Sequence, residues 1–534
     1  MTKRKRSQGS RESKNLPNLP TDIIREIQSI LPWKTVVRFS SLSKDWSSIW
    51  DCPTRIILDE VDFGVDHEEY SDADKAKRVT FLKYLTKFLE IRQRPSEYDC
   101  ELDKLFLRMT VEDSRAKTLA KKWIGFALEK KVKSLSLDLK TIYRNHYYLR
   151  GIAFCVTTLV DLTISYCEIT NCSFELPALK FLFLFVVCIE DDDFKDLIAG
   201  CPRIEKLGVK ETEKLQTIIV SNPELKFFGV NLPCLDGKIR IESANLESLE
   251  FISFSMDLCE VEITSTDTVR QLTLRKAYDQ PTLIHLIKKF PQLEKLVIDD
   301  CNILSEIEIS PKPTVRNLTL CNVSEEDTTW TTFIDQFVLL EKLIIADCKL
   351  QILHLSQPNL ASLVLKDCMV KYEVQVDSPK FKSLEFKGDV TKFKGIEDLH
   401  ELEFVMLYFD PVKLSHYWYS WLSEVLKSCA RSKHLSLICK TEEVIIFPIF
   451  VIDKVPVSDI KHLELEIMSC PNITQELLEN LIWILPDLKT LSLTLGSTTK
   501  FIKFSEENNK LLAQEVHNRK PDKRVSILKN QNSF

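Results

Sequence analysis

The chain has 534 residues, a formal net charge of -6, 16 cysteines and only 11 glycines. This charge argues against nucleic-acid binding by the chain as a whole, because such binding needs a basic surface that neutralises phosphates. No apolar run approaches the roughly 18 residues of a membrane span, so we also expect no membrane partner. The scarcity of glycine disfavours glycine-rich phosphate loops.

Residues 1–14 are polar and basic, and we expect a disordered tail. The run from Lys3 to Arg6 fits a nuclear import signal, and it fits a solvated tail equally well. The N-terminus has no apolar core of the kind found in signal peptides, so we expect the nucleus and/or the cytoplasm. In that reducing environment the cysteines should be free thiols, and with no C-x-x-C pair and scattered histidines we expect no metal site.

The segment 15–52 predicts three short helices. The first opens near Pro20, carries isoleucines at helical spacing and ends at Pro32. Thr35 and Ser43 are candidate N-caps of the second and third helices. A unit of about 35 residues is too small to bury this much apolar surface in a core of its own. We therefore expect an exposed apolar face, which either binds a partner or packs on the rest of the chain.

The same residues resemble the F-box motif, which implies binding to a Skp-type adaptor and, through it, to a cullin. Two positions depart from the motif: Leu42 stands where valine is commoner, and Asp45 stands where a basic residue is usual. The resemblance assigns the following residues to adaptor binding: Leu19, Pro20, Ile23, Ile24, Ile27, Leu31, Pro32, Val36, Val37, Leu42, Ser43, Lys44 and Trp46.

After this segment, Arg55–Leu58 predicts a strand and the acidic stretch 59–74 an exposed loop. Helical periodicity then indicates a helix over Val79–Ile91, and three further helices over Ser114–Glu129, Leu283–Phe290 and Gln475–Leu485. Other acidic groups, such as Glu190–Asp193, are expected in loops between repeats.

An apolar-x-x-apolar-x-apolar pattern recurs along most of the chain. The central apolar residues follow one another at intervals of 20 to 25 residues, which is the period of leucine-rich repeats. Each run predicts one short strand whose alternate side chains enter a core shared with the neighbouring repeats. The series is Leu162, Leu182, Leu207, Phe228, Leu249, Leu272, Leu296, Leu318, Leu343, Leu363 and Leu384, preceded by Leu105 and Leu135 and followed at looser spacing by Leu402, Leu435, Leu463 and Leu491.

Several cysteines come five residues after a repeat leucine, where the side chain should turn inward as a structural thiol. They are Cys167, Cys301, Cys348 and Cys368. Strand residues between the inward leucines should form the concave face; examples are Glu294, Lys295, Glu341, Lys342 and Ser362. The aromatic cluster Tyr417, Trp418, Tyr419 and Trp421 either contacts a partner or, as we favour, covers the core of an irregular repeat.

An F-box followed by irregular repeats resembles the plant F-box/LRR-repeat proteins, although no FBD-type C-terminal domain is evident. We therefore expect an α/β fold, in which a short all-α F-box precedes a curved leucine-rich-repeat solenoid with parallel strands over 53–504 and a polar tail over 505–534. The resemblance implies a substrate-recognition subunit of an SCF-type ubiquitin ligase, with an unknown target protein on the solenoid. Two alternatives remain: an adaptor-bound scaffold that acts without cullin, and an enzyme within the repeats. No catalytic motif is present in the sequence, so we expect no catalytic residue and no cofactor.

Overall fold

A computed structural model describes residues 23, 54–66, 71–93, 102–142, 146–231, 237–253, 259–276, 280–301, 314–323, 327–388, 392–394, 402–409, 416–429, 432–446, 460–469, 475–496 and 498–504. The chain divides into two compact units, 1–218 and 219–534, which we describe one at a time. Among the described helices, none combines the length and the apolar character that a membrane crossing requires.

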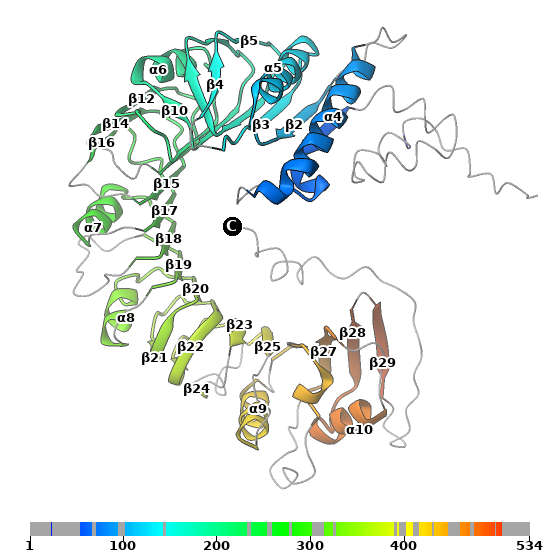
Figure 1. Cartoon of the computed structure of the whole chain (residues 1–534). Coiled ribbons are helices and arrows are strands. Elements are labelled where there is room, and N and C mark those ends of the chain that lie inside the picture. The colour runs from blue at the N-terminus through cyan, green and yellow to red at the C-terminus, as the bar shows by residue number, and fades with distance from the viewer. Residues whose placement is uncertain are drawn as a thin grey trace, which may run out of the picture. The chain divides into compact units, whose positions relative to one another are not determined.

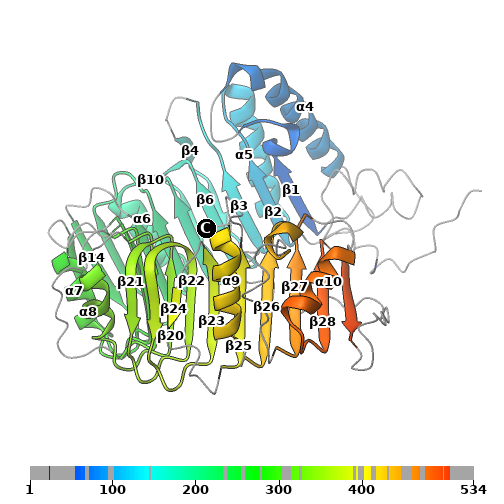
Figure 2. The same cartoon turned by 90° about the horizontal axis from the view of Figure 1, so that it is seen from below.

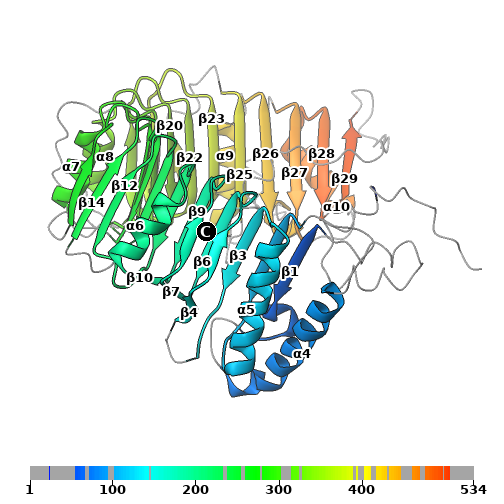
Figure 3. The same ribbon diagram turned by 90° about the horizontal axis from the view of Figure 1, so that it is seen from above.

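The first unit is built on a parallel sheet in the order β1-β2-β3-β6-β9-β11. Figure 3 shows β3, β6 and β9 side by side. Two smaller parallel sheets, β4-β7-β10 and β5-β8, accompany it. The bounds are β1 Arg55–Asp59, η2 Glu60–Phe63, η3 Asp72–Asp74, α4 Lys75–Arg92, β2 Lys104–Arg108, α5 Ser114–Glu129, β3 Ser134–Asp138, β4 Tyr147–Arg150, β5 Ala153–Cys155, β6 Asp161–Ser165, β7 Cys167–Thr170, β8 Ser173–Glu175, β9 Phe181–Phe185, β10 Cys188–Ile189, α6 Asp191–Ala199 and β11 Lys206–Lys210.

The second unit continues the same architecture, and its strands follow an arc with α7, α8, α9 and α10 on the outer side (Figure 1). The strands β25 to β28 stand next to one another behind α9 and α10 in Figure 2. Strand β12, Thr217–Ser221, lies at the boundary between the units. The other bounds are β13 Phe227–Asn231, β14 Gly237–Glu242, β15 Ser248–Ile252, β16 Cys259–Ile263, β17 Gln271–Arg275, α7 Gln280–Lys289, β18 Lys295–Asp299, β19 Asn317–Cys321, α8 Asp327–Ile334, β20 Lys342–Ala346, β21 Lys349–Leu355, β22 Ser362–Val376, β23 Ser383–Gly388, β24 Lys392–Lys394, β25 Phe404–Phe409, α9 His416–Ser428, β26 His434–Cys439, η4 Glu442–Val444, β27 His462–Ile467, α10 Gln475–Ile484, β28 Thr490–Leu495 and β29 Thr498–Lys503.

The repeat leucines form continuous ladders, which confirms the parallel-strand solenoid. Leu296 pairs with Leu272 on one side and with Leu318 on the other, and all three side chains are fully buried. Each such side chain contributes about 1.5–3 kcal/mol of transfer free energy when it leaves water. A repeat alone has no partner for its leucine, so the stability of each repeat depends on its neighbours.

One expected repeat position is wrong. Leu402 is buried but precedes its strand, and Val405 occupies the ladder position between Leu384 and Leu435. Leu402 lies three residues before the ladder residue, just as Phe381 does in the preceding repeat. The sequence pattern alone fits either Leu402 or Val405 as the ladder residue. Only the pairing with the neighbouring strands shows that it is Val405.

Most repeats turn after the strand through a residue with a left-handed backbone. This residue lies four positions after the repeat leucine, as in Asp300 after Leu296 and Asp347 after Leu343, with φ near +53°. Its backbone N–H donates to a carbonyl of the next repeat: Asp300 N to Cys321 O at 3.0 Å and Asp347 N to Lys366 O at 2.9 Å. This hydrogen bond offsets the steric cost of left-handed backbone in a residue that has a Cβ atom.

The residue after this turn points into the core, which confirms the expected role of the cysteines. Cys167, Cys301, Cys348 and Cys368 are all buried. Their thiols lie near backbone carbonyls, for example Cys301 Sγ at 3.3 Å from Asp299 O. Burial raises the pKa of the Cys167 thiol well above its ordinary value, which keeps it protonated and unreactive.

The acidic stretch after β1 is only partly the exposed loop that we expected. Glu60 is buried in η2 and accepts hydrogen bonds from the backbone N–H of Thr110 at 2.8 Å and from its hydroxyl. Asp74 is buried at the start of α4, where Lys77 Nζ lies 2.6 Å away. The Lys77 ammonium holds the pKa of the Asp74 carboxyl below its usual value. Glu60 therefore ties η2 to the residue pair after β2, and Asp74 binds the first turn of α4. Composition alone does not reveal either role.

A second acidic group also departs from expectation, because Glu190–Asp193 begins helix α6 instead of lying in a loop. Three carboxylates in a first turn suit the positive end of the helix dipole. Two of them also bind neighbouring repeats: Asp191 accepts from the N–H groups of Gln216 and Thr217, and Asp193 from that of Asn171.

Candidate functional site

The residues that we expect to bind an adaptor lie almost entirely outside the described residues, and their role stays a prediction. These are Leu19, Pro20, Ile24, Ile27, Leu31, Pro32, Val36, Val37, Leu42, Ser43, Lys44 and Trp46. Ile23 is described: it is helical and 43% exposed. An aliphatic side chain this exposed on a helix is available to a partner.

The open face of the second unit is the larger candidate surface. It consists of the strand side chains that alternate with the inward ladder. Lys295, Lys342 and Ser362 belong to its first row, as the sequence predicted. Glu294 and Glu341 do not belong to this face: they precede their strands, and each lies in a row of ion pairs along the edge, Arg270 with Glu294 and Arg316 with Glu341.

The middle of this open face is apolar. Val297, Ile344 and Val364 occupy the central row, with Ala346 beside them in the third row. Thr319 continues the central row between Val297 and Ile344. An uncharged strip on a solvent-facing sheet is a plausible place for the apolar side chains of a bound polypeptide.

Charged groups border this strip on both sides. Toward the N-terminal end of the unit, Arg275 lies between Glu250 at 3.5 Å and Asp299 at 3.8 Å. Burial raises the pKa of the Asp299 carboxyl, and the nearby Arg275 opposes that shift. Toward the C-terminal end, Lys387 Nζ lies 2.7 Å from Asp367 Oδ2 and 5.3 Å from the centre of the Tyr408 ring.

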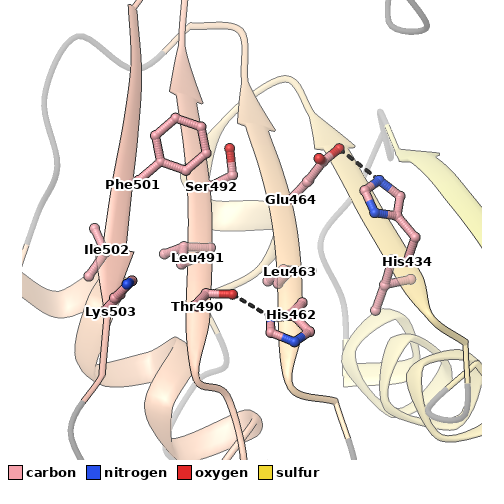
Figure 4. A pocket seen from close by; sticks show the side chains of 11 residues that line it. His434, His462, Leu463, Glu464, Thr490, Leu491, Ser492, Phe501, Ile502 and Lys503 are labelled. Carbon is pink, nitrogen blue, oxygen red and sulfur yellow. Dashed lines mark hydrogen bonds and ion pairs between the residues drawn. The ribbon is translucent and has the colours of Figure 1, made fainter. Parts of the chain in front are cut away.

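A hollow of about 280 Å³ opens at the C-terminal end of the same sheet, over strands β26 to β29 (Figure 4). His434 Nε2 lies 3.1 Å from Glu464 Oε2, and the imidazole stacks on the Phe404 ring at 5.5 Å. His462 Nδ1 lies 2.5 Å from Thr490 Oγ1. The residues that line the hollow are His434, Leu435, His462, Leu463, Glu464, Thr490, Leu491, Ser492, Phe501, Ile502 and Lys503.

The mixture of imidazole, hydroxyl, carboxylate and phenyl groups suits one polar or aromatic side chain of a bound protein. Sequence reasoning did not identify this site. Its residues come from four strands, of which β26, β27 and β28 belong to different repeats, and a hydrophobic pattern marks only the inward half of each strand. The signal that was available is the polar residue next to each repeat leucine, such as His434 and His462.

The first unit carries an aromatic open face instead. On β9, Phe181, Phe183 and Phe185 alternate with the inward leucines, and Phe185 is exposed. The Phe183 ring covers Gly208 on β11, where an added Cβ would lie 2.5 Å from the ring. Lys206 Nζ lies 5.5 Å from the centre of the Phe181 ring. Gly208 is therefore required for the close approach of this ring to the neighbouring strand.

The aromatic cluster of α9 mainly packs, as we favoured. Trp418, Tyr419 and Trp421 are buried, and Trp418 Nε1 donates to Val444 O at 2.9 Å. Phe409 on β25 meets both indoles edge to face, at 5.2 and 5.3 Å. Tyr417 differs, because 80% of it is exposed.

The described carboxylates and imidazoles mostly serve structure or solubility. Those on the open faces form ion pairs with lysine and arginine, and those at helix starts accept backbone N–H groups.

Comparison with known proteins shows similarity to plant F-box and leucine-rich-repeat proteins. Residues 120–274 match a family model described as FBD-associated F-box protein At5g56370, LRR repeats. Three relatives from Arabidopsis thaliana are similar to the chain: the FBD-associated F-box protein At4g13985 (27% identical, covering 53% of this chain and 56% of the relative), the F-box/LRR-repeat protein At1g06630 (26%, covering 48% and 62%) and the F-box/FBD/LRR-repeat protein At1g78750 (25%, covering 66% and 69%).

The chain thus spans roughly half to two thirds of the length of these relatives. Among solved structures, a TLR13–ssRNA13 complex matches with 18% identity over 74% of this chain and 58% of the other, at a TM-score of 0.36, which is too low to carry an argument. The family match, the repeated names of the relatives and the parallel-strand repeats agree. The chain is similar to plant F-box/LRR-repeat proteins.

Proposed function

We propose that this protein is the substrate-recognition subunit of an SCF-type ubiquitin ligase. The observation that carries the proposal is the order of parts: an F-box-like segment, Leu19 to Trp46, precedes repeats whose relatives are named F-box/LRR-repeat proteins. The F-box residues would bind a Skp-type adaptor, and the adaptor would recruit cullin. The exposed helical Ile23 supports this assignment, because it offers an apolar contact at a position that the motif requires.

The target protein would bind the open face of the second unit. Its apolar strip around Val297 and Ile344 would supply contact area, and the hollow at His434 and His462 would select one side chain of the target. The protein would then act by proximity, because holding target and ligase together raises the effective concentration of target lysines. This role needs no catalytic residue in the chain and no cofactor.

A second candidate function is an adaptor-bound scaffold that works without cullin. It shares the F-box and the open face with the first function, so only the recruitment of cullin separates the two. Both functions belong in the nucleus and/or the cytoplasm, which we propose as the location. The basic run Lys3–Arg6 would act as the import signal in the nuclear case.

Co-purification of the full chain with a Skp-type adaptor and cullin tests the proposal. We expect the wild-type chain to retain both, and the variants Ile23→Asp and Leu19→Ala/Pro20→Ala to lose both. Val79→Asp is the matched control: Val79 is also an exposed aliphatic residue on a helix, 45% exposed in α4, but lies outside the motif. This variant should bind the adaptor as the wild type does.

The outcomes separate the candidate functions. Adaptor without cullin in the wild-type sample supports the scaffold. Undiminished adaptor binding by both motif variants contradicts the F-box assignment. Equal loss in the Val79→Asp control would show that any charge on a helix surface disrupts binding, and it would remove the evidence for a specific site.

A further inference from the structure

Three potential metal ligands meet at the edge of the small β4-β7-β10 sheet in the first unit. They are His146, which directly precedes β4, Cys188 in β10 and Glu213 after β11. Their ligand atoms, an imidazole nitrogen, the thiol sulfur and a carboxylate oxygen, all lie within 4.8 Å of one another. The expectation of no metal site relied on local spacing, but these residues are 42 and 25 positions apart in the sequence.

Strand register brings the cluster together. Tyr148 pairs with Glu168, Glu168 with Cys188, and Cys188 with Glu213, so these residues form one row across consecutive repeats. The bridge is fixed by two backbone hydrogen bonds: Ile189 N to Glu213 O at 3.2 Å and Glu213 N to Val187 O at 2.9 Å. Residues in one row of parallel strands point to the same side of the sheet, and His146 lies two positions before Tyr148 on the same side.

The donor set matches the preferences of a borderline divalent cation. Zinc binds thiolate at about 2.3 Å and imidazole or carboxylate at about 2.0–2.2 Å. Tetrahedral coordination therefore places its ligand atoms roughly 3.3–3.8 Å apart. The ligand atoms need to approach one another by about 1.5 Å at most to reach this geometry. Cys188 is only 3% exposed, so its side chain is held in place by its neighbours. Glu213 is exposed and His146 is half-buried, so both of these side chains can move toward the thiol.

A cationic side chain already occupies this place. The ammonium of Lys214, the residue after Glu213, lies 3.4 Å from Glu168 Oε1. The Lys214 side chain is half exposed and can swing into solvent.

We propose that His146, Cys188 and Glu213 bind a zinc-type divalent cation, which displaces the Lys214 ammonium. On binding, the S–H bond of Cys188 breaks, a sulfur–metal bond forms and the proton passes to solvent. Water or Glu168, on the other side of Cys188, completes the coordination. Such a site would link the repeats of β3, β9 and β11 in the first unit.

Cobalt(II) titration of the purified full chain tests the site, because a cobalt–thiolate bond gives a charge-transfer absorption that other ligands do not. We expect this absorption with Co²⁺, its loss on addition of Zn²⁺, and no competition from Mg²⁺ or Ca²⁺, which prefer oxygen ligands. The variants Cys188→Ser and His146→Gln should weaken binding at least roughly 10-fold, since even loss of an outer-shell partner usually costs that much.

Two further variants make the test specific. Cys155→Ser is the matched control, because Cys155 is an exposed thiol of the same unit outside the cluster, and it should leave the titration unchanged. Lys214→Gln should tighten binding several-fold, since it removes the competing cation. Equal cobalt absorption in wild type and Cys188→Ser, or weaker binding by Lys214→Gln, would overturn the proposal. Unchanged circular dichroism of His146→Gln would show that any loss of binding is not caused by misfolding.

Discussion

The second unit contains two kinds of repeat, which differ in how the chain leaves the strand. In the repeats of β17 to β20 the strands have five residues, and a left-handed residue such as Asp300 or Asn322 follows one position later. In the repeats of β25 to β28 the strands have six residues, so the residue four positions after the ladder residue is still part of the strand. We call the first kind turned repeats and the second kind straight repeats.

Both kinds bring one more side chain into the core, but at different positions. In the turned repeats this side chain lies five residues after the ladder residue, as in Cys301 and Cys348. In the straight repeats it lies four residues after, as in Cys439 and Ile467, both fully buried. A left-handed turn costs about 1–2 kcal/mol in a residue with a Cβ atom. Straight repeats avoid this cost, but they have longer connections, which contain the helices α9 and α10.

The inward ladder common to both kinds should show the largest effect of mutation. Replacing Leu296 with aspartate places an unpaired charge in a fully buried position, and we expect a loss of at least about 4 kcal/mol of unfolding free energy. Because each repeat is stabilised by its neighbours, the loss should spread to adjacent repeats. Thermal unfolding followed by circular dichroism measures the effect.

Lys295→Asp is the control for this change, since Lys295 is the preceding residue on the same strand and points outward. It should shift the midpoint of unfolding little. A Leu296→Asp variant that melts like the wild type would mean that the ladder register is wrong.

The straight repeats should depend strongly on their helices. Trp418 is 2% exposed and fixed by its hydrogen bond to Val444, so Trp418→Ala should cost about 3–5 kcal/mol. Tyr417→Ala, one residue earlier in α9 but mostly exposed, should change stability by less than about 0.5 kcal/mol. Urea unfolding of both variants measures the difference. Similar losses in the two variants would show that α9 does not anchor these repeats through its buried face.

The sequence predicted the parallel repeats well because the buried half of each strand obeys a simple spacing rule. The same rule failed at Leu402, where two apolar residues three positions apart both become buried and only strand pairing selects Val405. It also missed the buried carboxylates Glu60 and Asp74, whose partners are backbone groups and a lysine that composition does not connect to them. Hydrophobic periodicity reports where apolar side chains go, and it is silent about polar pairings.

The candidate sites show the same limit more clearly. The F-box residues are predicted from a local motif, and all of them except Ile23 lie outside the described residues. The hollow at His434 and the cluster at Cys188 each combine residues from different repeats. Such sites depend on which residues share a row, and a row is defined only when the register of every intervening strand is known.

The smallest expected change in unfolding free energy comes from a substitution at a left-handed turn. The sign of this change distinguishes a strained turn from a relaxed one. Val186 has φ near +51°, where a β-branched residue is disfavoured, and its N–H donates to Lys210 O at 2.9 Å. Val186→Asn keeps the hydrogen bond and suits the left-handed backbone, so it should stabilise the protein by about 0.5–1 kcal/mol. Val160→Asn is the matched control: Val160 is also half-buried and hydrogen-bonded through its N–H to the adjacent repeat, to Lys133 O at 2.7 Å.

Val160 leads into a strand, so asparagine there should be neutral or destabilising by up to about 1 kcal/mol. Differential scanning calorimetry of the full chain compares the thermal unfolding midpoints of the two variants with that of the wild type. Opposite shifts of the two midpoints would establish that the left-handed turn at Val186 carries backbone strain. A lower midpoint for Val186→Asn would mean that contacts of the valine side chain outweigh that strain.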